Sequence, residues 1–111
     1  MEIENFERLQ LCAEKTAHGV QVYVSASVED GKLTLSGQDL GTMVDDTFGD
    51  SDYEYWYVFT EDNTNKLFEL ICKTDTPQAA LKKNFSGIDG CKYLREFCEA
   101  NGIEFGFSSY A

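Results

Sequence analysis

The run GQDLGTMVDDTFGDSDYEYWYVFTE, residues 37–61, decides how this chain folds, because an acidic connection containing glycines leads directly into a strand dense in aromatic residues. No Lys or Arg occurs between Lys32 and Lys66, whereas eight Asp and Glu residues do. This third of the chain therefore carries most of the formal net charge of -11. Glycines interrupt Leu40–Ser51, and its apolar residues follow neither the strand nor the helix period. We therefore expect that segment to leave the sheet.

The chain then returns as a strand over Tyr53–Phe59. Alternation places Tyr53, Tyr55, Tyr57 and Phe59 on one face and Glu54, Trp56 and Val58 on the other. Both faces are aromatic or apolar, so the strand is either covered on both sides or leaves one aromatic face for a partner. We expect Trp56 in the core, and the tyrosines nearer a wet edge where their hydroxyls find partners.

Upstream lies the clearest element in the sequence, a hairpin over Val20–Leu35. Apolar residues alternate with polar ones through its first arm, and Asp30-Gly31 predicts a two-residue loop of type I′. The resulting register places Glu29 opposite Lys32, Val28 opposite Leu33, Ala26 opposite Leu35 and Val24 opposite Gly37. Apolar residues thus face each other and opposite charges pair, which supports this register.

A first strand is expected before this hairpin, over Arg8–Lys15. Its alternation would put Leu9, Leu11 and Ala13 on one face and Cys12, with its polar neighbours, on the other. A helix over Glu4–Lys15 is the alternative interpretation, because some of the same apolar residues also fit helical spacing. His18-Gly19 predicts the turn that follows.

Downstream, three helices and a last strand are expected. Thr60 or Asp62 would cap a helix reaching about Lys73, and Thr76-Pro77 would open a second reaching about Asn84. Ser86 with Asp89 resembles a capping box for a third helix, which Asn101-Gly102 ends. The helices would bury apolar residues that include Leu67, Leu70, Ile71, Ile88, Cys91 and Leu94, and Ile103–Tyr110 alternates as the final strand.

Strands come first and helices are grouped, in the order β-β-β-β-α-α-α-β. This order predicts an α+β fold with a mainly antiparallel sheet of about five strands and helices packed on one face. A length of 111 residues fits one domain spanning residues 1–111. The N-terminal MEIENFERLQ lacks a basic region followed by an apolar run, and no apolar run is long enough to span a bilayer. We therefore expect a cytoplasmic protein.

Candidate sites for metals, cofactors and catalysis are weak. The four cysteines form no C-x-x-C, so reduced core thiols are expected. The order D-D-T-F-G-D-S-D does not match a calcium loop. Asp39 is the best single candidate for acid/base chemistry, although an Asp bonded to its own turn is the commoner role. We expect no metal, no cofactor and no catalytic residue, and hence no enzyme.

An interaction surface has more support. Carboxylates spread over a loop and strand can imitate spaced phosphates and attract a basic protein, while aromatic residues anchor contacts. The predicted binding residues are Asp45, Asp46, Asp50, Asp52, Tyr53, Glu54, Tyr55 and Tyr57. The expected partner is a basic protein, such as a toxin or a nucleic-acid-binding protein, with no direct binding to nucleic acid or membranes because the chain is acidic.

The runs GQDLG, GDSDYEYWYVF, NTNKLFEL and GIEFGFSSY together resemble a small acidic bacterial family, met mostly as hypothetical proteins. The resemblance brings no catalytic motif. In size, charge and architecture the chain is also similar to toxin-neutralising immunity proteins and to phage-encoded inhibitors of host defence, which implies an inhibitory role. Two alternatives stay open: a small enzyme or ligand-binding domain with a pocket near the GQDLG run, and a homodimer formed through the helical face. Either a monomer or a homodimer fits the sequence.

Overall fold

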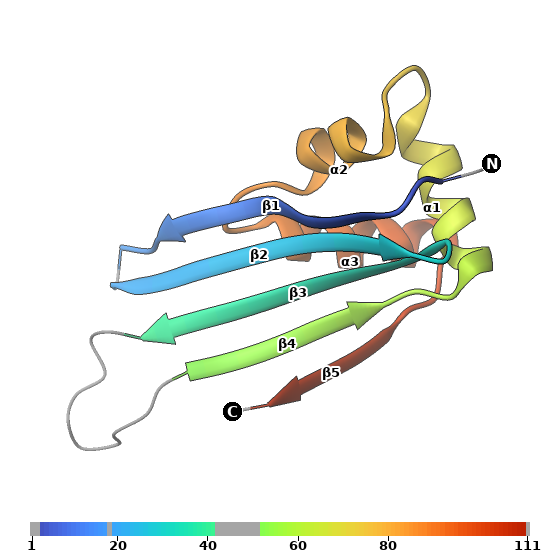
Figure 1. Ribbon diagram of the computed structural model, residues 1–111. Coiled ribbons are helices and arrows are strands. Elements are labelled where there is room, and N and C mark those ends of the chain that lie inside the picture. The colour runs from blue at the N-terminus through green and yellow to red at the C-terminus, as the bar shows by residue number, and fades with distance from the viewer. Residues whose placement is uncertain (1–2, 18, 42–51, 111) are drawn as a thin grey trace.

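The fold is a five-stranded antiparallel sheet with three helices inserted before its last strand, so the α+β prediction is confirmed. The computed structural model describes residues 3–17, 19–41 and 52–110. The strands are β1 (Phe6–Lys15), β2 (Val20–Glu29), β3 (Lys32–Gly41), β4 (Asp52–Val58) and β5 (Gly106–Tyr110). The helices are α1 (Glu61–Cys72), α2 (Pro77–Phe85) and α3 (Gly90–Asn101). Each strand pairs with its neighbour in the sequence, in the order β1-β2-β3-β4-β5 (Figure 1).

The predicted hairpin forms in the predicted register. Glu29 pairs with Lys32 and Val28 with Leu33, as the sequence indicated. Asp30 and Gly31 have φ values of 54° and 77°, the two positive values that a type I′ loop requires. The pairing continues to Gly41, so β3 takes up the start of the segment expected to leave the sheet. The remainder of that segment, residues 42–51, and the predicted turn residue His18 lie outside the described residues.

The three helices lie on one side of the sheet (Figure 1), and we call the side they cover the inner face. Alternate residues of β2, β3 and β4 point to this face and form the core with the helices. The largest fully buried side chains are Phe59, Phe68, Leu33, Leu35, Leu67, Leu81 and Leu94. No helix covers the opposite side of the described sheet, which we call the outer face. Antiparallel sheets commonly have one face packed on the core and the other exposed to solvent.

The first strand differs from its predicted alternation, and the helix considered for this region does not form. Irregularities interrupt the β1–β2 ladder between Phe6 and Leu9 and between Gln10 and Cys12. Leu11 and Cys12 are consequently both buried, whereas Ala13 is exposed. The extra residue of a bulge shifts the side-chain alternation by one, so the predicted faces are wrong from Cys12 onward.

Helix α1 begins as predicted, at the Thr60 cap, whose hydroxyl accepts a hydrogen bond from the Asn63 amide at 3.2 Å. One predicted core position is wrong. Leu70 is 44% exposed, while Phe68 is fully buried. The inward face of α1 is therefore centred on Thr64, Leu67, Phe68 and Ile71.

Helix α2 opens with the predicted Thr76-Pro77 pair, but the capping box predicted for α3 does not form. Ser86 ends α2 and its hydroxyl donates to the Lys82 carbonyl, while Asp89 makes no side-chain cap. An added Cβ at Gly90 would lie 2.0 Å from the Phe85 carbonyl oxygen, so α3 starts where only glycine fits.

Two predictions about the neighbours of α3 are also wrong. Ile88 precedes α3 and is exposed, so it belongs neither to the helix nor to the core. The last strand begins at Gly106 rather than at Ile103, because the chain from Ile103 to Phe105 fills the core edge instead of pairing. The predicted helix stop is confirmed: Gly102 ends α3 in the left-handed conformation, with φ 67°.

Candidate functional site

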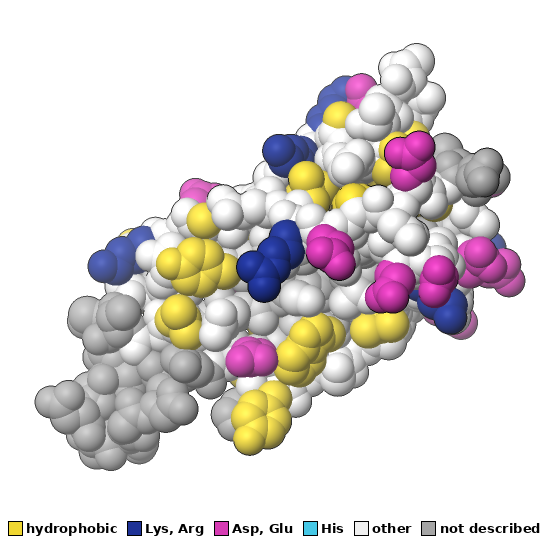
Figure 2. All heavy atoms as spheres, viewed as in Figure 1, with side chains coloured by type: hydrophobic (Ala, Val, Ile, Leu, Met, Phe, Trp, Pro, Cys, Tyr) yellow, Lys and Arg dark blue, Asp and Glu magenta, His cyan; other side chains and the backbone are white. Residues whose placement is uncertain are grey.

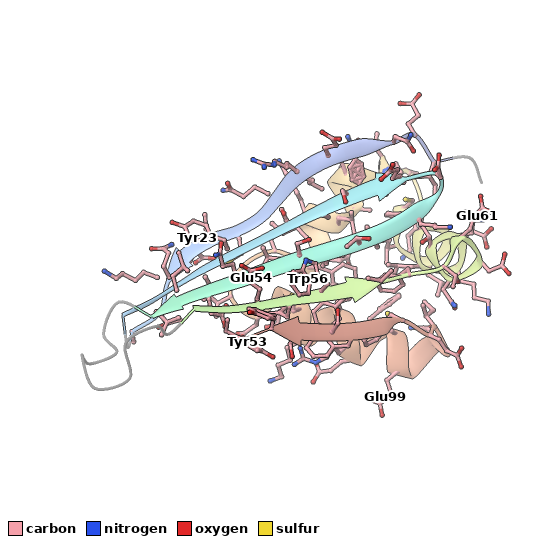
Figure 3. All side chains as sticks on the ribbon, turned by 60° about the horizontal axis from the view of Figure 1, so that its bottom comes forward. Tyr23, Tyr53, Glu54, Trp56, Glu61 and Glu99 are labelled. Atoms are coloured by element: carbon pink, nitrogen blue, oxygen red, sulfur yellow. The ribbon has the colours of Figure 1, made fainter. Side chains whose placement is uncertain are left out.

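The outer face carries two rows of polar and aromatic side chains, one of which crosses all five strands. One row runs through Gln10, Ser25, Ser36, Trp56 and Ser108, which pair residue by residue from β1 to β5. The next row contains Tyr23, Gln38, Glu54 and Tyr110. Figure 3 shows Tyr23, Glu54 and Trp56 over this part of the sheet. Short hydroxyls therefore alternate with three large aromatic rings on a surface that no helix covers.

These rows border a shallow hollow of about 830 Å³ that is open to solvent. Its lining includes Arg8, Tyr23, Gln38, Glu54 and Trp56. Figure 2 views this face, where white atoms, which are backbone and other side chains, lie between the hydrophobic and the charged side chains. The hollow touches the GQDLG run at Gly37 and Gln38, in the region where the sequence placed a possible pocket.

The inner face near the same end of the sheet carries a ladder of tyrosines. The rings of Tyr53 and Tyr55 lie 5.5 Å apart and those of Tyr55 and Tyr57 lie 6.1 Å apart. Gly37 lies beneath Tyr55, since a Cβ added there would come within 2.0 Å of the Tyr55 ring. The glycine of the GQDLG run thus lets an aromatic ring lie against β3.

Asp39, the candidate for acid/base chemistry, belongs to this inner-face cluster. The Tyr55 hydroxyl donates to its Oδ1 at a long 3.4 Å. Burial raises the pKa of Asp39, and the Tyr55 hydrogen bond opposes that rise. Burial likewise raises the pKa of Tyr55 far above its usual range. Asp39 is not among the residues that line the hollow on the outer face.

Tyr57 is a core residue. Its side chain is 2% exposed, and its hydroxyl accepts a hydrogen bond from Nη1 of Arg95 at 2.6 Å. Burial raises its pKa and the Arg95 guanidinium partly offsets that rise. Because Tyr57 is enclosed, it cannot act as the contact anchor that the sequence suggested. Trp56 was expected in the core, and this prediction is wrong as well. Trp56 lies half-buried on the outer face.

The remaining predicted binding residues are divided between the two faces. Asp45, Asp46 and Asp50 lie outside the described residues. Asp52 begins β4 opposite Leu40. Glu54 points to the outer face and Tyr53 and Tyr55 to the inner one, so a single flat partner surface cannot touch all three. From the sequence, the outer-face rows were not identified as a candidate site. The alternation of the hairpin indicates which residues share a face, so these rows could have been found once the helices were expected on one side of the sheet.

The four cysteines are free and buried, as predicted. Burial raises the pKa of each thiol, to about 11 for Cys91 and Cys98, so the nucleophilic thiolate is scarce at neutral pH. Within the described parts of the chain, no three His, Cys, Asp or Glu side chains gather as metal ligands. No helix among the same residues is long and apolar enough to cross a membrane.

Few of the acidic side chains that the structure describes are engaged in ion pairs. One pair, between Lys83 and Asp75 at 3.7 Å, occurs over residues 3–17, 19–41 and 52–110, and it lies on the helical side. The chain has 20 Asp and Glu residues against nine Lys and Arg residues. Most carboxylates of the described structure therefore have no cation within 4.0 Å, and their charge faces solvent.

No family model, curated protein or solved structure matches this chain.

Proposed function

We propose that the protein is a non-catalytic interaction domain that captures a basic surface of another protein with the acidic end of its sheet. The observation that carries this proposal is the scarcity of ion pairs. A chain of net charge -11 has one ion pair among its described residues, and that pair lies far along the sequence from the acidic run. Carboxylates that are not neutralised within the molecule remain available to a partner.

The proposed surface lies where β3 ends and β4 begins. Glu54 points outward one row from Trp56, and Asp52 opens the strand. The connection before it supplies Asp45, Asp46 and Asp50, and residues 33–65 contain no Lys or Arg; the one cation that the pairing brings into the row of Asp52 is Lys15 of β1. A concentration of one charge sign at one end steers an oppositely charged partner and raises its association rate.

The partner class that fits this surface is a protein with a basic groove. Nucleic-acid-binding proteins present such grooves, and carboxylates spaced along a loop and strand can occupy the positions of phosphates. An inhibitor or immunity protein that blocks such a groove is the most concrete form of the proposal. The raised pKa values of the buried thiols, which keep the nucleophilic thiolate scarce, favour binding over catalysis.

A pull-down from the native host at low salt would test this proposal. The wild type is compared with a variant in which Asp45, Asp46, Asp50 and Asp52 are all changed to Asn. A control variant changes four other acids to Gln: Glu4, Glu29, Glu69 and Glu104, all of them exposed. Both variants gain four units of charge, so the comparison separates the position of the acids from the net charge.

We expect a basic protein to be retained by the wild type and the control, and lost by the acidic-end variant. Its association rate should fall as salt rises, because steering is screened over about 10 Å at 0.1 M ionic strength. Equal recovery with all three proteins, or an association rate insensitive to salt, would contradict the proposal.

The hollow on the outer face favours a second function, the binding of a small polar ligand. Its lining combines two aromatic rings, Tyr23 and Trp56, with the Gln38 amide and the Glu54 carboxylate. Such a mixture suits a neutral ligand that has both hydroxyls and an apolar face, as a sugar does.

Trp56 is the single tryptophan of the chain, so its fluorescence reports on this hollow directly. Titration with a panel of neutral saccharides should shift its emission, with the shift lost in Gln38→Ala; a flat response across the panel would exclude this candidate.

A further inference from the structure

The two edges of the sheet are protected to very different degrees. The β1 edge is interrupted by two irregularities and carries Glu7, Arg8, Glu14 and Lys15. Bulges and charges are the devices by which proteins prevent an edge strand from pairing with another chain. The β5 edge has neither: its sequence GFSSY contains no charged residue and no proline, and its ladder with β4 is regular. Strand β5 is therefore open to a further strand.

Apolar rings are exposed along β5. Phe107 is 52% exposed on the inner face and Tyr110 is 73% exposed on the outer face. Figure 1 shows β5 as the last strand at its side of the sheet, with no described segment beyond it. Exposed rings beside an unpaired backbone edge favour the addition of a strand, because both gain contacts at once.

The sequence of β5 is complementary to itself in the antiparallel direction. With Ser108 opposite Ser108 of a second copy, Gly106 lies opposite the second copy's Tyr110, and Phe107 lies opposite its Ser109. Each large ring thus meets a small residue, and the tyrosine can cover the glycine of the other edge, a pairing known to stabilise strands. The axis relating the two strands is a two-fold, the commonest symmetry of protein dimers.

The flank of the molecule beside β5 does not oppose such an approach. A hollow of about 460 Å³ there is lined by Lys92, Arg95, Glu96 and Glu99 of α3, together with Ile103 and Phe105. Two cations and two anions balance on this helix face, in a chain whose net charge is -11. The two-fold axis reverses α3 in the second copy, so the cationic half of one helix is directed toward the anionic half of the other.

We infer that β5 is a dimerisation edge, at which two copies of this chain pair antiparallel about Ser108 and join their sheets into one of ten strands. This edge differs from the helical face that the sequence suggested for a homodimer. Its Tyr110 end borders the acidic end of the sheet at Glu54, but dimerisation of the pure chain requires no basic partner, so the failure of either proposal can be distinguished from the failure of the other. The paired strand is short, and the dimer should therefore be weak, with a dissociation constant that is roughly micromolar or higher.

Sedimentation velocity over a dilution series of the full chain tests this inference. The mass of the wild type should rise from 12.5 kDa toward twice that value as the concentration increases. Because Ser108 faces itself across the axis, Ser108→Lys and Ser108→Asp each place like charges together, and each should stay monomeric. An equimolar mixture of the two variants should recover the dimer, since the charges then attract. Matched controls are Thr34→Lys and Thr34→Asp, which change another residue of the outer face and should dimerise as the wild type does.

Three outcomes would overturn the inference: a wild type that stays monomeric at every concentration, single Ser108 variants that dimerise like the wild type, or a charge-swapped mixture that does not recover. Hydrogen exchange on the wild type gives a test that does not depend on the folding of any variant. Amides of β5 should exchange more slowly at high than at low protein concentration, while those of β1 should not change. Equal exchange in β5 at both concentrations would contradict the pairing.

Discussion

At the scale of single residues, the Thr64 hydroxyl joins the first helix to the hairpin. Thr64 is fully buried, and its Oγ1 accepts a hydrogen bond from the Leu33 amide at 3.0 Å. We expect Thr64→Val to lower the free energy of unfolding by about 1–3 kcal/mol, because the Leu33 amide would then be buried without an acceptor. Denaturant unfolding measures this change. Thr64→Ser keeps the hydroxyl and should cost clearly less, so equal losses in both variants would show that packing, not the hydrogen bond, matters.

Asp39 should give the stability of the protein a recognisable dependence on pH. Burial raises its folded-state pKa above the ordinary 3.8, so the folded protein holds this proton more tightly than the unfolded chain does. The free energy of unfolding therefore falls as pH rises from 3.8 through the raised value, and the cost persists above it. Asp39→Asn removes this titration, and it should stabilise the protein at neutral pH and flatten the stability profile in that window. Thermal unfolding between pH 3.5 and 7 checks both effects; an unchanged profile would contradict the assignment.

At the scale of elements, the contact between β3 and β4 depends on a glycine. A Cβ at Gly37 would lie 2.0 Å from the Tyr55 ring, which must then move. Gly37→Ala should destabilise the protein by about 1–3 kcal/mol, as overpacking does. If the ring is the cause, Tyr55→Ala should relieve the clash, and the double variant should lose less stability than the two single losses added together. If the two losses of stability are additive, the cost of Gly37→Ala arises in the β3 backbone and not from the contact with the Tyr55 ring.

The same elements show what local sequence can and cannot predict. The β2–β3 hairpin was predictable because Asp30-Gly31 specifies its loop and the alternation specifies its register. The Thr60 and Thr76 caps were predictable for the same local reason. The bulges of β1 were not predictable, because its sequence also fits an uninterrupted period of two, and the shift caused by an extra residue is visible only in the pairing with β2. The start of α3 at Gly90 depends on a close approach to Phe85, a contact that no sequence window contains.

At the scale of the whole molecule, the candidate site could be predicted in part. Charge is a sum over the chain, so the acidic run and the lack of Lys and Arg within it were visible in the sequence, whereas the position of Lys15 at the same end of the sheet was not. The face on which each residue lies depends on which side of the sheet the helices cover. That choice leaves Trp56 half-buried on the outer face and encloses Tyr57, the reverse of what ring size and hydroxyl chemistry alone indicated.

The four thiols offer a test of whether this molecule opens as one unit. Cys12, Cys72, Cys91 and Cys98 are all buried, on β1, α1 and α3, so a reagent reaches them when the core opens. Labelling of the native protein at pH 8, counted by mass spectrometry, should be at least about 1,000-fold slower than labelling in denaturant, because the open fraction of a stable domain is that small. Thr64→Val should accelerate all four thiols by one common factor if opening is global. A single thiol that reacts early would instead locate a local opening, and Cys91, at the start of α3, would then mark that helix as the least stable element.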